Sequence, residues 1–503
     1  MTDNAVLIGF SGQPEQLLLH RANRHGLVAG ATGTGKTVTL QVLAQALSDA
    51  GVPVFAADVK GDLSGIAAIG TPNEKMLARA AGMNLELHPA AAPVIFWDLF
   101  GQAGHPVRAT VSEMGPLLIA RMLELNDVQE GVLTVVFRAA DEEGLLLLDM
   151  KDLQAALTYA ADNAKDLSAR FGNISPATIA TIQRKLLVLE TQGGANLFGE
   201  PALQLSDLMR TDASGRGYVS VLAADKLIAS PKLYATFLLW LLSELFEELP
   251  EVGDPDKPRL AFFFDEAHLL FRDAPKALLE KVEQVVRLIR SKGVGVYFVT
   301  QNPADIPETV LGQLGNRIQH ALRAYTPVEQ RGLKAAADSF RPNPAFDTAE
   351  TIQALGVGEA LVSVLDEKGA PTVVQKTLIR PPASRLGPLT PPERAAVMGQ
   401  SPVRGLYDQA LDRESAYEVL QKQVASAQAE AEEAKAAAAR AKEAKEAQDD
   451  EPRRAPARGS SRMGMTEIFA NTLVRNVANQ VGRELMRGLL GGLTGTSRGR
   501  RRR

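Results

Sequence analysis

The segment Gly30-Ala31-Thr32-Gly33-Thr34-Gly35-Lys36-Thr37 decides the fold that this chain of 503 residues is expected to adopt. It fits the pattern G-x-x-x-x-G-K-[ST], follows a short apolar strand predicted at 26–29, and precedes a helix predicted at 37–50. Glycines at three positions let backbone N–H groups approach phosphate oxygens, and the start of a helix adds a positive dipole end. The context predicts a phosphate-binding loop rather than an incidental glycine-rich turn.

Each residue of this loop has an expected role in holding a nucleotide. Lys36 is predicted to reach the β- and γ-phosphates, and the Thr37 hydroxyl is predicted to join the shell of a Mg²⁺ ion. The rest of the loop and the adjoining Val38 are candidate nucleotide contacts.

A second, acidic site is predicted where another buried strand ends. The apolar run 260–264 leads directly into Asp265 and Glu266. At the carboxyl end of such a strand, Asp265 is expected to hold Mg²⁺, usually through water, and Glu266 to polarise the attacking water as a general base. Ordinary acidic capping of the strand is the alternative, and His268 is equally consistent with a packing residue.

Two further clusters follow strands of the same predicted sheet. Gln301 follows the strand predicted at 294–300 and is expected to hydrogen-bond the γ-phosphate or the lytic water. Its alternative role is to cap a loop together with Asn302. After the strand predicted at 52–58, Asp58 and Asp62 either support the metal and water, with Lys60 as counter-charge, or form a simple turn.

Strand and helix signals alternate along the chain, which predicts an α/β fold with a parallel sheet. Further strands are predicted at 93–99, 217–222, 318–323 and 360–365, and a covering helix at 233–249. The predicted organisation has five parts. They are a first core part at 1–71, a mainly helical inserted subdomain at 72–210, a second core part at 211–380, a proline-rich linker with an Ala/Glu/Lys-rich helix at 381–464, and an amphipathic helix with an arginine-rich tail at 465–503.

The C-terminal part has its own composition. The segment 415–448 is strongly helix-forming but offers little apolar surface beyond alanine, so a solvated single helix is favoured over a coiled coil. Residues 449–464 are expected to be flexible. Six apolar residues then recur every fourth position and predict one helical stripe. They are Phe469, Leu473, Val477, Val481, Leu485 and Leu489.

Composition excludes several classes of protein. Hydrophobic residues form 45% of the chain, and there is no cysteine, which excludes a disulfide framework, a cysteine nucleophile and cysteine-based metal sites. The six histidines lack ligand-like spacing. Neither a signal peptide nor an apolar run long enough to span a bilayer is recognisable, so a cytoplasmic location is predicted.

The charge is unevenly distributed along the sequence. The net charge is −4, but the last 53 residues, 451–503, contain 12 Arg and 3 Glu. The remainder of the chain is therefore acidic, and the basic tail predicts a polyanionic partner bound without sequence reading.

Taken together, these motifs resemble those of HerA/FtsK-type ATPases. Within that superfamily the chain is similar to the YjgR-like bacterial proteins, described as having a HerA-like helicase C-terminal domain. The resemblance extends from the N-terminus to about residue 380 and, more loosely, to the final helix. The segments that carry it are His25 with the phosphate loop, Asp58/Lys60/Gly61/Asp62, Phe264-Asp265-Glu266-Ala267-His268, Thr300-Gln301-Asn302-Pro303 and Asn316-Arg317-Ile318.

The resemblance implies a RecA-like (ASCE) P-loop core that uses ATP and Mg²⁺. It also implies a hexameric ring in which an arginine from a neighbouring subunit completes each ATP site. Arg317 and Arg323 are the candidates for that arginine, and Arg287 and Arg290 compete as pore-facing or interface residues. The implied activity is that of a helicase-type ATPase that translocates double-stranded DNA.

Two other functions remain open from the sequence. One is a ring ATPase of the conjugation and secretion branch, acting on protein at a membrane. The other is a nucleotide-dependent switch or scaffold, which needs neither interface arginines nor a charged pore. The final helix is expected to pack on its own hexamer, with a peripheral membrane or partner-protein contact as the alternative.

Overall fold

The chain folds around a single mixed β-sheet in the computed structural model, which describes residues 4–272 and 276–449. Within these residues the sheet has twelve strands in the order β2-β1-β12-β11-β10-β3-β9-β8-β4-β7-β5-β6. The strands are β1 (Ala5–Phe10), β2 (Pro14–Leu18), β3 (Gly26–Ala29), β4 (Val54–Asp58), β5 (Val94–Asp98), β6 (His105–Pro106), β7 (Val219–Ala223), β8 (Leu260–Phe264), β9 (Val294–Thr300), β10 (Asn316–Gln319), β11 (Glu359–Ser363) and β12 (Gln375–Ile379).

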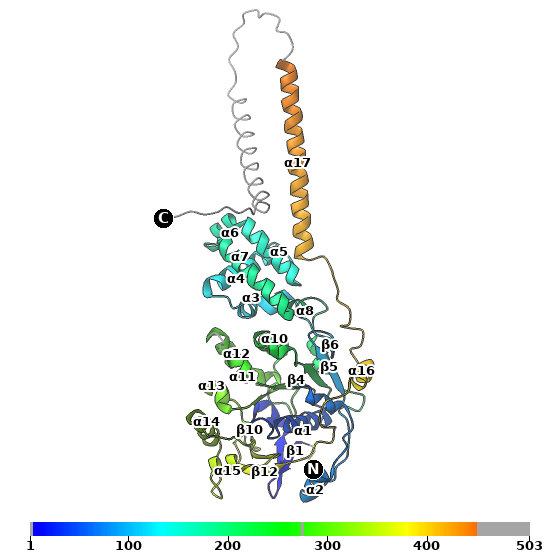
Figure 1. The fold of residues 1–503 in the computed structure, drawn as a ribbon, viewed down its shortest axis with the longest axis vertical. Helices are drawn as coiled ribbons and strands as arrows, with labels where there is room; N and C mark the ends of the chain where they lie inside the picture. The colour runs from blue at the N-terminus through cyan, green and yellow to red at the C-terminus, as the bar shows by residue number, and fades with distance from the viewer. Residues whose placement is uncertain (1–3, 273–275, 450–503) are drawn as a thin grey trace, which may run out of the picture. The chain divides into compact units, whose positions relative to one another are not determined.

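Helices occupy most of the connections between strands (Figure 1). In the described ranges the α-helices are α1 (Lys36–Asp49), α2 (Glu74–Gly82), α3 (Val111–Met122), α4 (Asp127–Glu142), α5 (Met150–Asp162), α6 (Ala164–Phe171), α7 (Pro176–Leu189), α8 (Ala195–Leu197), α9 (Leu205–Leu208), α10 (Pro231–Glu248), α11 (His268–Phe271), α12 (Lys276–Leu288), α13 (Glu308–Leu311), α14 (Pro327–Asp338), α15 (Thr348–Ala354), α16 (Pro391–Gly399) and α17 (Ala416–Asp449).

The part of the sheet that runs from β10 to β6 is parallel throughout. β3, which leads into the phosphate loop, pairs with β10 on one side and β9 on the other, and β9 in turn pairs with β8. Because parallel strands end at the same edge, the loops after β3, β9, β8 and β4 meet there. This arrangement confirms the predicted α/β class with a RecA-like P-loop core.

Side chains of the central strands alternate between two hydrophobic layers, as the period of a strand requires. In β8, Phe262 and Phe264 face the layer that contains α10, α11 and α12, while Ala261 and Phe263 face the layer that contains α1. All five residues of β8 are buried. Burial on both sides explains why the sequence of this strand is continuously apolar.

The other edge of the sheet is antiparallel. Its strand β11 matches the strand predicted at 360–365, whereas β1, β2 and β12 were not predicted from the sequence. β1 and β2 form a hairpin, and β12 lies between β1 and β11. Their sequences lack a long apolar run because these strands are only partly buried. The strand predicted at 318–323 is β10, which begins two residues earlier, at Asn316, and ends at Gln319.

The range 72–210, predicted as a helical insertion, contributes to the sheet as well as to a helical region. β5 pairs with β7 in the parallel sheet, and β6 pairs with β5. The helices α3 to α9 follow β6 and form what we call the helical region, residues 111–208.

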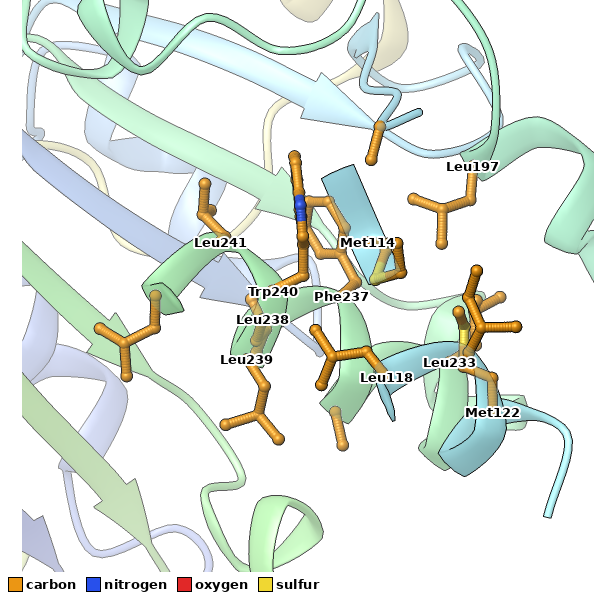
Figure 2. Packing of buried hydrophobic residues seen from close by; sticks show 14 of the residues in the cluster. Met114, Leu118, Met122, Leu197, Leu233, Phe237, Leu238, Leu239, Trp240 and Leu241 are labelled. Carbon is orange, nitrogen blue, oxygen red and sulfur yellow. The ribbon is translucent and has the colours of Figure 1, made fainter. Parts of the chain in front are cut away.

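Packing between α3 and α10 joins the helical region to the sheet. Figure 2 shows Met114, Leu118 and Met122 of α3 facing the apolar side chains of α10, with Leu197 alongside. Phe237 and Trp240 of α10 lie in this contact and are almost completely buried. Because α10 also covers β8, it connects the helical region to the strand that leads into Asp265 and Glu266.

The segment after β12, which the sequence predicts as a proline-rich linker, lies against α1 and η2 (Asp62–Ala67) at its start. Gln41 of α1 donates to the Ser384 hydroxyl (2.8 Å) and the Arg385 carbonyl (2.9 Å), and the Ser384 amide donates to Gln45 (3.1 Å). The Leu389 amide donates to the Ser64 hydroxyl (3.0 Å). The glutamine side chains satisfy backbone groups that have no partner strand, so the proline-rich segment is held without regular structure.

The chain divides into two compact units, Met1–Ser426 and Ala427–Arg503. α17 crosses this division and continues as a helix to Asp449, in agreement with the helix predicted at 415–448. The amphipathic helix and basic tail predicted after residue 464 lie outside the described residues. Among the helices of residues 4–272 and 276–449, none is both long and apolar enough to cross a membrane.

The contact between α3 and α10 predicts the cost of truncating its central aromatic residue. Phe237→Ala should lower the free energy of unfolding by about 3–5 kcal/mol, because the lost phenyl ring leaves a cavity between the two helices. Urea denaturation followed by circular dichroism measures this change. Leu187→Ala on α7 is the control: with 57% of Leu187 exposed, we expect a change below about 0.5 kcal/mol. Equal effects of the two substitutions would contradict the packing described here.

Candidate active site

The phosphate loop spans the turn between β3 and α1 and is tied to the strands on either side. The Gly30 amide donates to the Thr300 carbonyl at the end of β9 (3.3 Å), and the Ala31 amide donates to the Ala321 carbonyl beyond β10 (2.9 Å). The loop is thus fixed by the two strands that flank β3.

Three glycines of the loop adopt conformations that other residues rarely accept. Gly33 has φ +77° and Gly35 has φ +118°. Gly30 has φ +150° and is constrained by space as well, because a Cβ atom there would lie 2.5 Å from the Cβ of His320. The glycines of the motif are therefore required by the backbone itself.

The Lys36 side chain turns back over its own loop. Its Nζ donates to the carbonyls of Gly30 (2.5 Å) and Ala31 (3.1 Å), and the residue is buried. Burial lowers the pKa of Lys36, and the charge of Lys60 acts in the same direction, while Glu266 and Asp265 oppose it.

The hydroxyl residues of the loop lie at different depths. Thr34 donates to the Ala31 carbonyl (2.7 Å) and so stabilises the turn. Thr37 and Val38 are half-buried in the first turn of α1. Thr32 is exposed, and its Oγ1 lies 3.5 Å from the side-chain amide oxygen of Gln301.

The acidic pair follows β8 and has an unusual backbone. Glu266 has φ +48°, in the left-handed region that disfavours a residue with a Cβ atom. Two contacts hold it there: the Glu266 amide donates to Asp265 Oδ1 (2.9 Å), and the Tyr234 hydroxyl of α10 donates to the Asp265 carbonyl (2.7 Å). An observed strain of this kind at a carboxylate is typical of functional sites.

The two adjacent carboxyls are electrostatically costly in this position. Burial raises the pKa of Asp265 to about 7, and the negative charge of Glu266 acts in the same direction. Lys60 partly opposes this shift, with its Nζ 3.7 Å from Glu266 Oε1. A cation beside Asp265 would favour its charged form, so the donor set fits a divalent metal ion.

Gln301 links the phosphate loop to the acidic pair. Its Nε2 lies 3.3 and 3.5 Å from the carboxylate oxygens of Glu266, while its Oε1 faces Thr32. The position follows from the sheet order, since β9 lies between β3 and β8. His268 Nδ1 is 3.4 Å from Glu266 Oε2 but makes no hydrogen bond in the structure.

The Asp58 carboxylate accepts hydrogen bonds within the turn that follows β4. It accepts hydrogen bonds from the amides of Gly61 (2.8 Å) and Leu63 (3.1 Å). Burial raises the pKa of Asp58 to about 6, helped by the charge of Asp62. Of the two interpretations of this cluster, the turn accounts for Asp58, whereas Lys60 reaches the acidic pair.

The candidate arginines differ in what their guanidinium groups contact. Arg317 is half-buried and donates to the carbonyls of Leu311, Leu314 and Ser339. Arg323 is exposed, and one nitrogen donates to the Gln353 carbonyl (2.7 Å). Arg287 at the end of α12 and Arg290 just after it are both exposed.

Two residues that support the site, His320 and Tyr234, were not predicted from the sequence. His320, completely buried, contacts Thr39 of α1 through Nε2 (2.9 Å) and the Glu359 carbonyl through Nδ1 (2.9 Å). Burial lowers the pKa of His320 to about 4, and the charge of Lys36 acts in the same direction, which keeps the imidazole neutral. Tyr234 was also missed, because neither residue lies in a recognisable motif. A polar residue following β10 at the loop's edge was the available signal for His320.

Comparison with known proteins places these motifs in context. A family model described as Helicase HerA-like C-terminal matches residues 5–501. The DNA double-strand break repair helicase HerA of Sulfolobus acidocaldarius is 22% identical over 362 residues, or 71% of this chain. The match spans 65% of that protein's length, slightly less than two thirds.

Two solved structures are also similar in their chain course. The plasmid coupling protein TrwB in complex with ADP and Mg²⁺ aligns with 76% of this chain and 92% of its own, at 16% identity and a TM-score of 0.45. VirB4 of Thermoanaerobacter pseudethanolicus aligns with 78% of this chain and 98% of its own, at 13% identity and a TM-score of 0.49. At this level of similarity neither supports an inference about activity.

The left-handed backbone of Glu266 gives a prediction that is independent of any enzyme assay. Glu266→Gly should be more stable than Glu266→Ala by about 1 kcal/mol, because glycine accepts a positive φ without a Cβ clash. Chemical denaturation of the two variants measures the difference.

The same pair of substitutions at Lys334, exposed in the helix α14, provides the control. There glycine should be less stable than alanine by about 1 kcal/mol, since the backbone is helical. The same sign at both positions would contradict the conformation of Glu266.

Proposed function

The chain belongs to the family of helicase HerA-like C-terminal domains, and from that membership we propose that it is an ATP-hydrolysing ring motor acting on double-stranded DNA. The observation that carries the proposal is the line of contacts from Thr32 through Gln301 to Glu266. It joins a phosphate-binding loop to a general base at one edge of the sheet.

In the proposed mechanism the loop binds the triphosphate and its residues orient it for hydrolysis. Backbone N–H groups of residues 30–37 and the Lys36 ammonium contact the phosphates, so Lys36 must leave the carbonyls of Gly30 and Ala31. Thr37 and Asp265 would hold Mg²⁺. When bound, this ion neutralises charge on the phosphate oxygens and on the buried carboxyls.

Glu266 is the residue proposed to activate water. Its carboxylate is buried beside Lys60 and faces Gln301, so it is directed into the space next to the phosphate loop. It would accept a proton from the attacking water, while the Gln301 amide orients that water or the γ-phosphate. Tyr234, through the Asp265 carbonyl, keeps the Glu266 backbone in place.

A ring arrangement would supply the missing positive charge from a neighbouring subunit. Arg323 fits this role better than Arg317, because its guanidinium is exposed and, among the described residues, donates to the Gln353 carbonyl alone. Arg317 already donates to three carbonyls and serves its own subunit. An arginine supplied in this way stabilises the charge of the transition state.

Double-stranded DNA is the proposed substrate on two grounds. The similar archaeal protein HerA is named as a DNA double-strand break repair helicase. The sequence also ends in an arginine-rich segment, with 12 Arg in residues 451–503, that suits binding to phosphates without base recognition.

Purified protein should hydrolyse ATP in the presence of Mg²⁺, and duplex DNA should accelerate the reaction at low salt. Lys36→Ala should abolish nucleotide binding, since it removes the ammonium that contacts the phosphates. Glu266→Gln should still bind nucleotide, but kcat should fall at least about a hundredfold through loss of the general base. Steady-state phosphate release and nucleotide titration measure these effects.

Lys334→Ala, on the surface of α14, is the control and should match the wild type. Wild-type hydrolysis by Lys36→Ala would overturn the ATPase proposal. Hydrolysis that duplex DNA leaves unchanged at low salt would overturn the DNA motor and favour a protein substrate or a switch.

The two arginine candidates give separate outcomes. Arg323→Ala should lower kcat at least about tenfold at unchanged Tm, as expected for an arginine that acts on the phosphates. Arg317→Ala should instead lower Tm, because three backbone carbonyls lose their donor.

Mixing subunits tests whether Arg323 acts on a neighbour. Arg323→Ala subunits keep the phosphate loop and Lys36→Ala subunits keep Arg323, so mixed assemblies should recover activity that neither variant has alone. If no mixture recovers activity, Arg323 does not act across an interface.

A further inference from the structure

A second loop lies directly against the phosphate loop. This supporting loop, Gly356–Gly358, precedes β11. The Gly358 amide donates to the Thr34 carbonyl (3.1 Å). The two backbones are so close that a Cβ atom on Gly35 would lie 3.4 Å from the Gly358 nitrogen and 3.5 Å from its Cα.

The contact at the Thr34 carbonyl fixes the direction of a backbone donor in the phosphate loop. Thr34 C=O and Gly35 N–H belong to one planar trans peptide, so they point in opposite directions. With the carbonyl turned toward the supporting loop, the Gly35 N–H is turned away from it. The orientation of this N–H therefore depends on where Gly358 is held.

Arg79 of α2 holds the supporting loop. Its Nη2 donates to the Val357 carbonyl (3.1 Å), and its Nη1 donates to the carbonyls of Gly358 (3.3 Å) and Ile379 (3.5 Å). The guanidinium thus adds to the backbone hydrogen bond from the Ile379 amide to the Gly358 carbonyl (2.9 Å), which also joins the supporting loop to the end of β12. Hydrogen bonds from a charged donor are stronger than neutral ones.

The geometry of Gly358 fits the arginine closely. Gly358 has φ +78°, and a Cβ atom there would lie 2.1 Å from Arg79 Nη1. The left-handed backbone conformation therefore favours glycine at this position, and a side chain there would displace the guanidinium. Arg79 and Gly358 are thus a matched pair, because a side chain at position 358 would occupy the place of the Arg79 guanidinium.

The rest of α2 is a mostly exposed helix. Lys75 and Leu77 are exposed, and of its nine residues, all within the described part of the chain, Ala80 alone is buried. Asn73 caps the helix through its own turn. The side chain of Arg79 reaches from this surface helix to a loop that is 279 positions further along the sequence.

We propose that Arg79 is a positioning residue for the nucleotide: by holding Gly358 against Thr34, it keeps the phosphate loop in its binding conformation. The inference rests on the proposed nucleotide-binding function. Arg79 does not touch the general base, so its loss should weaken nucleotide affinity and leave the chemical step nearly unchanged. The phosphate loop is supported from α2, outside the motif itself.

The test compares Arg79→Ala, Arg79→Lys and the control Lys75→Ala in the full chain. We expect Arg79→Ala to raise the Kd for a fluorescent ADP analogue with Mg²⁺ by about five- to twentyfold, as for loss of hydrogen bonds from a charged group. The kcat at saturating ATP should stay within about twofold. Arg79→Lys should give an intermediate Kd, and Lys75→Ala should match the wild type.

Hydrogen exchange on the nucleotide-free protein provides a readout that a general stability effect would not give. Arg79→Ala should speed exchange in the peptides that cover residues 30–37 and 356–358, with the helical region unchanged. Faster exchange throughout the chain would mean a general loss of stability and would overturn the proposal. This comparison remains decisive even if the alanine variant has a lower Tm, and Arg79→Lys repeats it with less disturbance.

A double substitution tests whether the matched pair acts together. Gly358→Ala should also raise the Kd, and Arg79→Ala combined with Gly358→Ala should raise it by less than the product of the single effects. Independent effects would overturn the proposed contact. If the wild type binds nucleotide and Arg79→Ala binds it equally well, the inference alone fails. If the wild type binds no nucleotide, the proposed function fails, and the inference with it.

Discussion

The parallel pairing of β9 with β3 on one side and β8 on the other is the constraint on which the site depends. Backbone hydrogen bonds in these two ladders fix the strand ends next to one another. The phosphate loop lies more than two hundred residues before the acidic pair and Gln301 in the sequence, yet all three meet at one edge. A shift in either pairing would separate the phosphate site from the general base, whatever the motifs contained.

Several residues at this edge are held in conformations or environments that they would avoid in isolation. Glu266 has a left-handed backbone, Asp265 is a buried carboxyl with a raised pKa, and Lys36 is a buried ammonium. The acidic pair is stabilised from outside its own motif, by Tyr234 of α10 and by Lys60 after β4, whereas Lys36 donates to two carbonyls of its own loop. Contacts from the surrounding fold offset the free energy lost to backbone strain and to buried charge. Bound phosphate and metal ions would lower this free energy further.

The scaffold that supplies this support reaches well beyond the parallel core. α10 covers β8 and packs on α3, so the helical region rests on the strand that ends in the acidic pair. On the other side, Arg79 of α2 contacts the supporting loop, which lies beside the phosphate loop, and the segment that follows β12 lies against α1. Movement of either layer would reach the candidate site through direct contacts.

The sequence by itself determined the phosphate loop, the acidic pair, the α/β class and most of the central strands. These are local patterns. The glycine spacing predicts the phosphate loop, and a continuous apolar run that ends in carboxylates predicts a buried strand with an acidic end. The roles predicted for the individual site residues stay predictions, because geometry alone does not test them.

Only the tertiary structure decided which distant groups support the site. Contacts between segments far apart in the chain place the hairpin β1–β2 in the sheet and bring His320 and Tyr234 to the site. They also leave the Arg323 guanidinium exposed, while that of Arg317 is half-buried. A sequence gives the residue type at a position, but not whether its side chain donates to a backbone carbonyl or faces solvent. That distinction comes from packing, which no local pattern encodes.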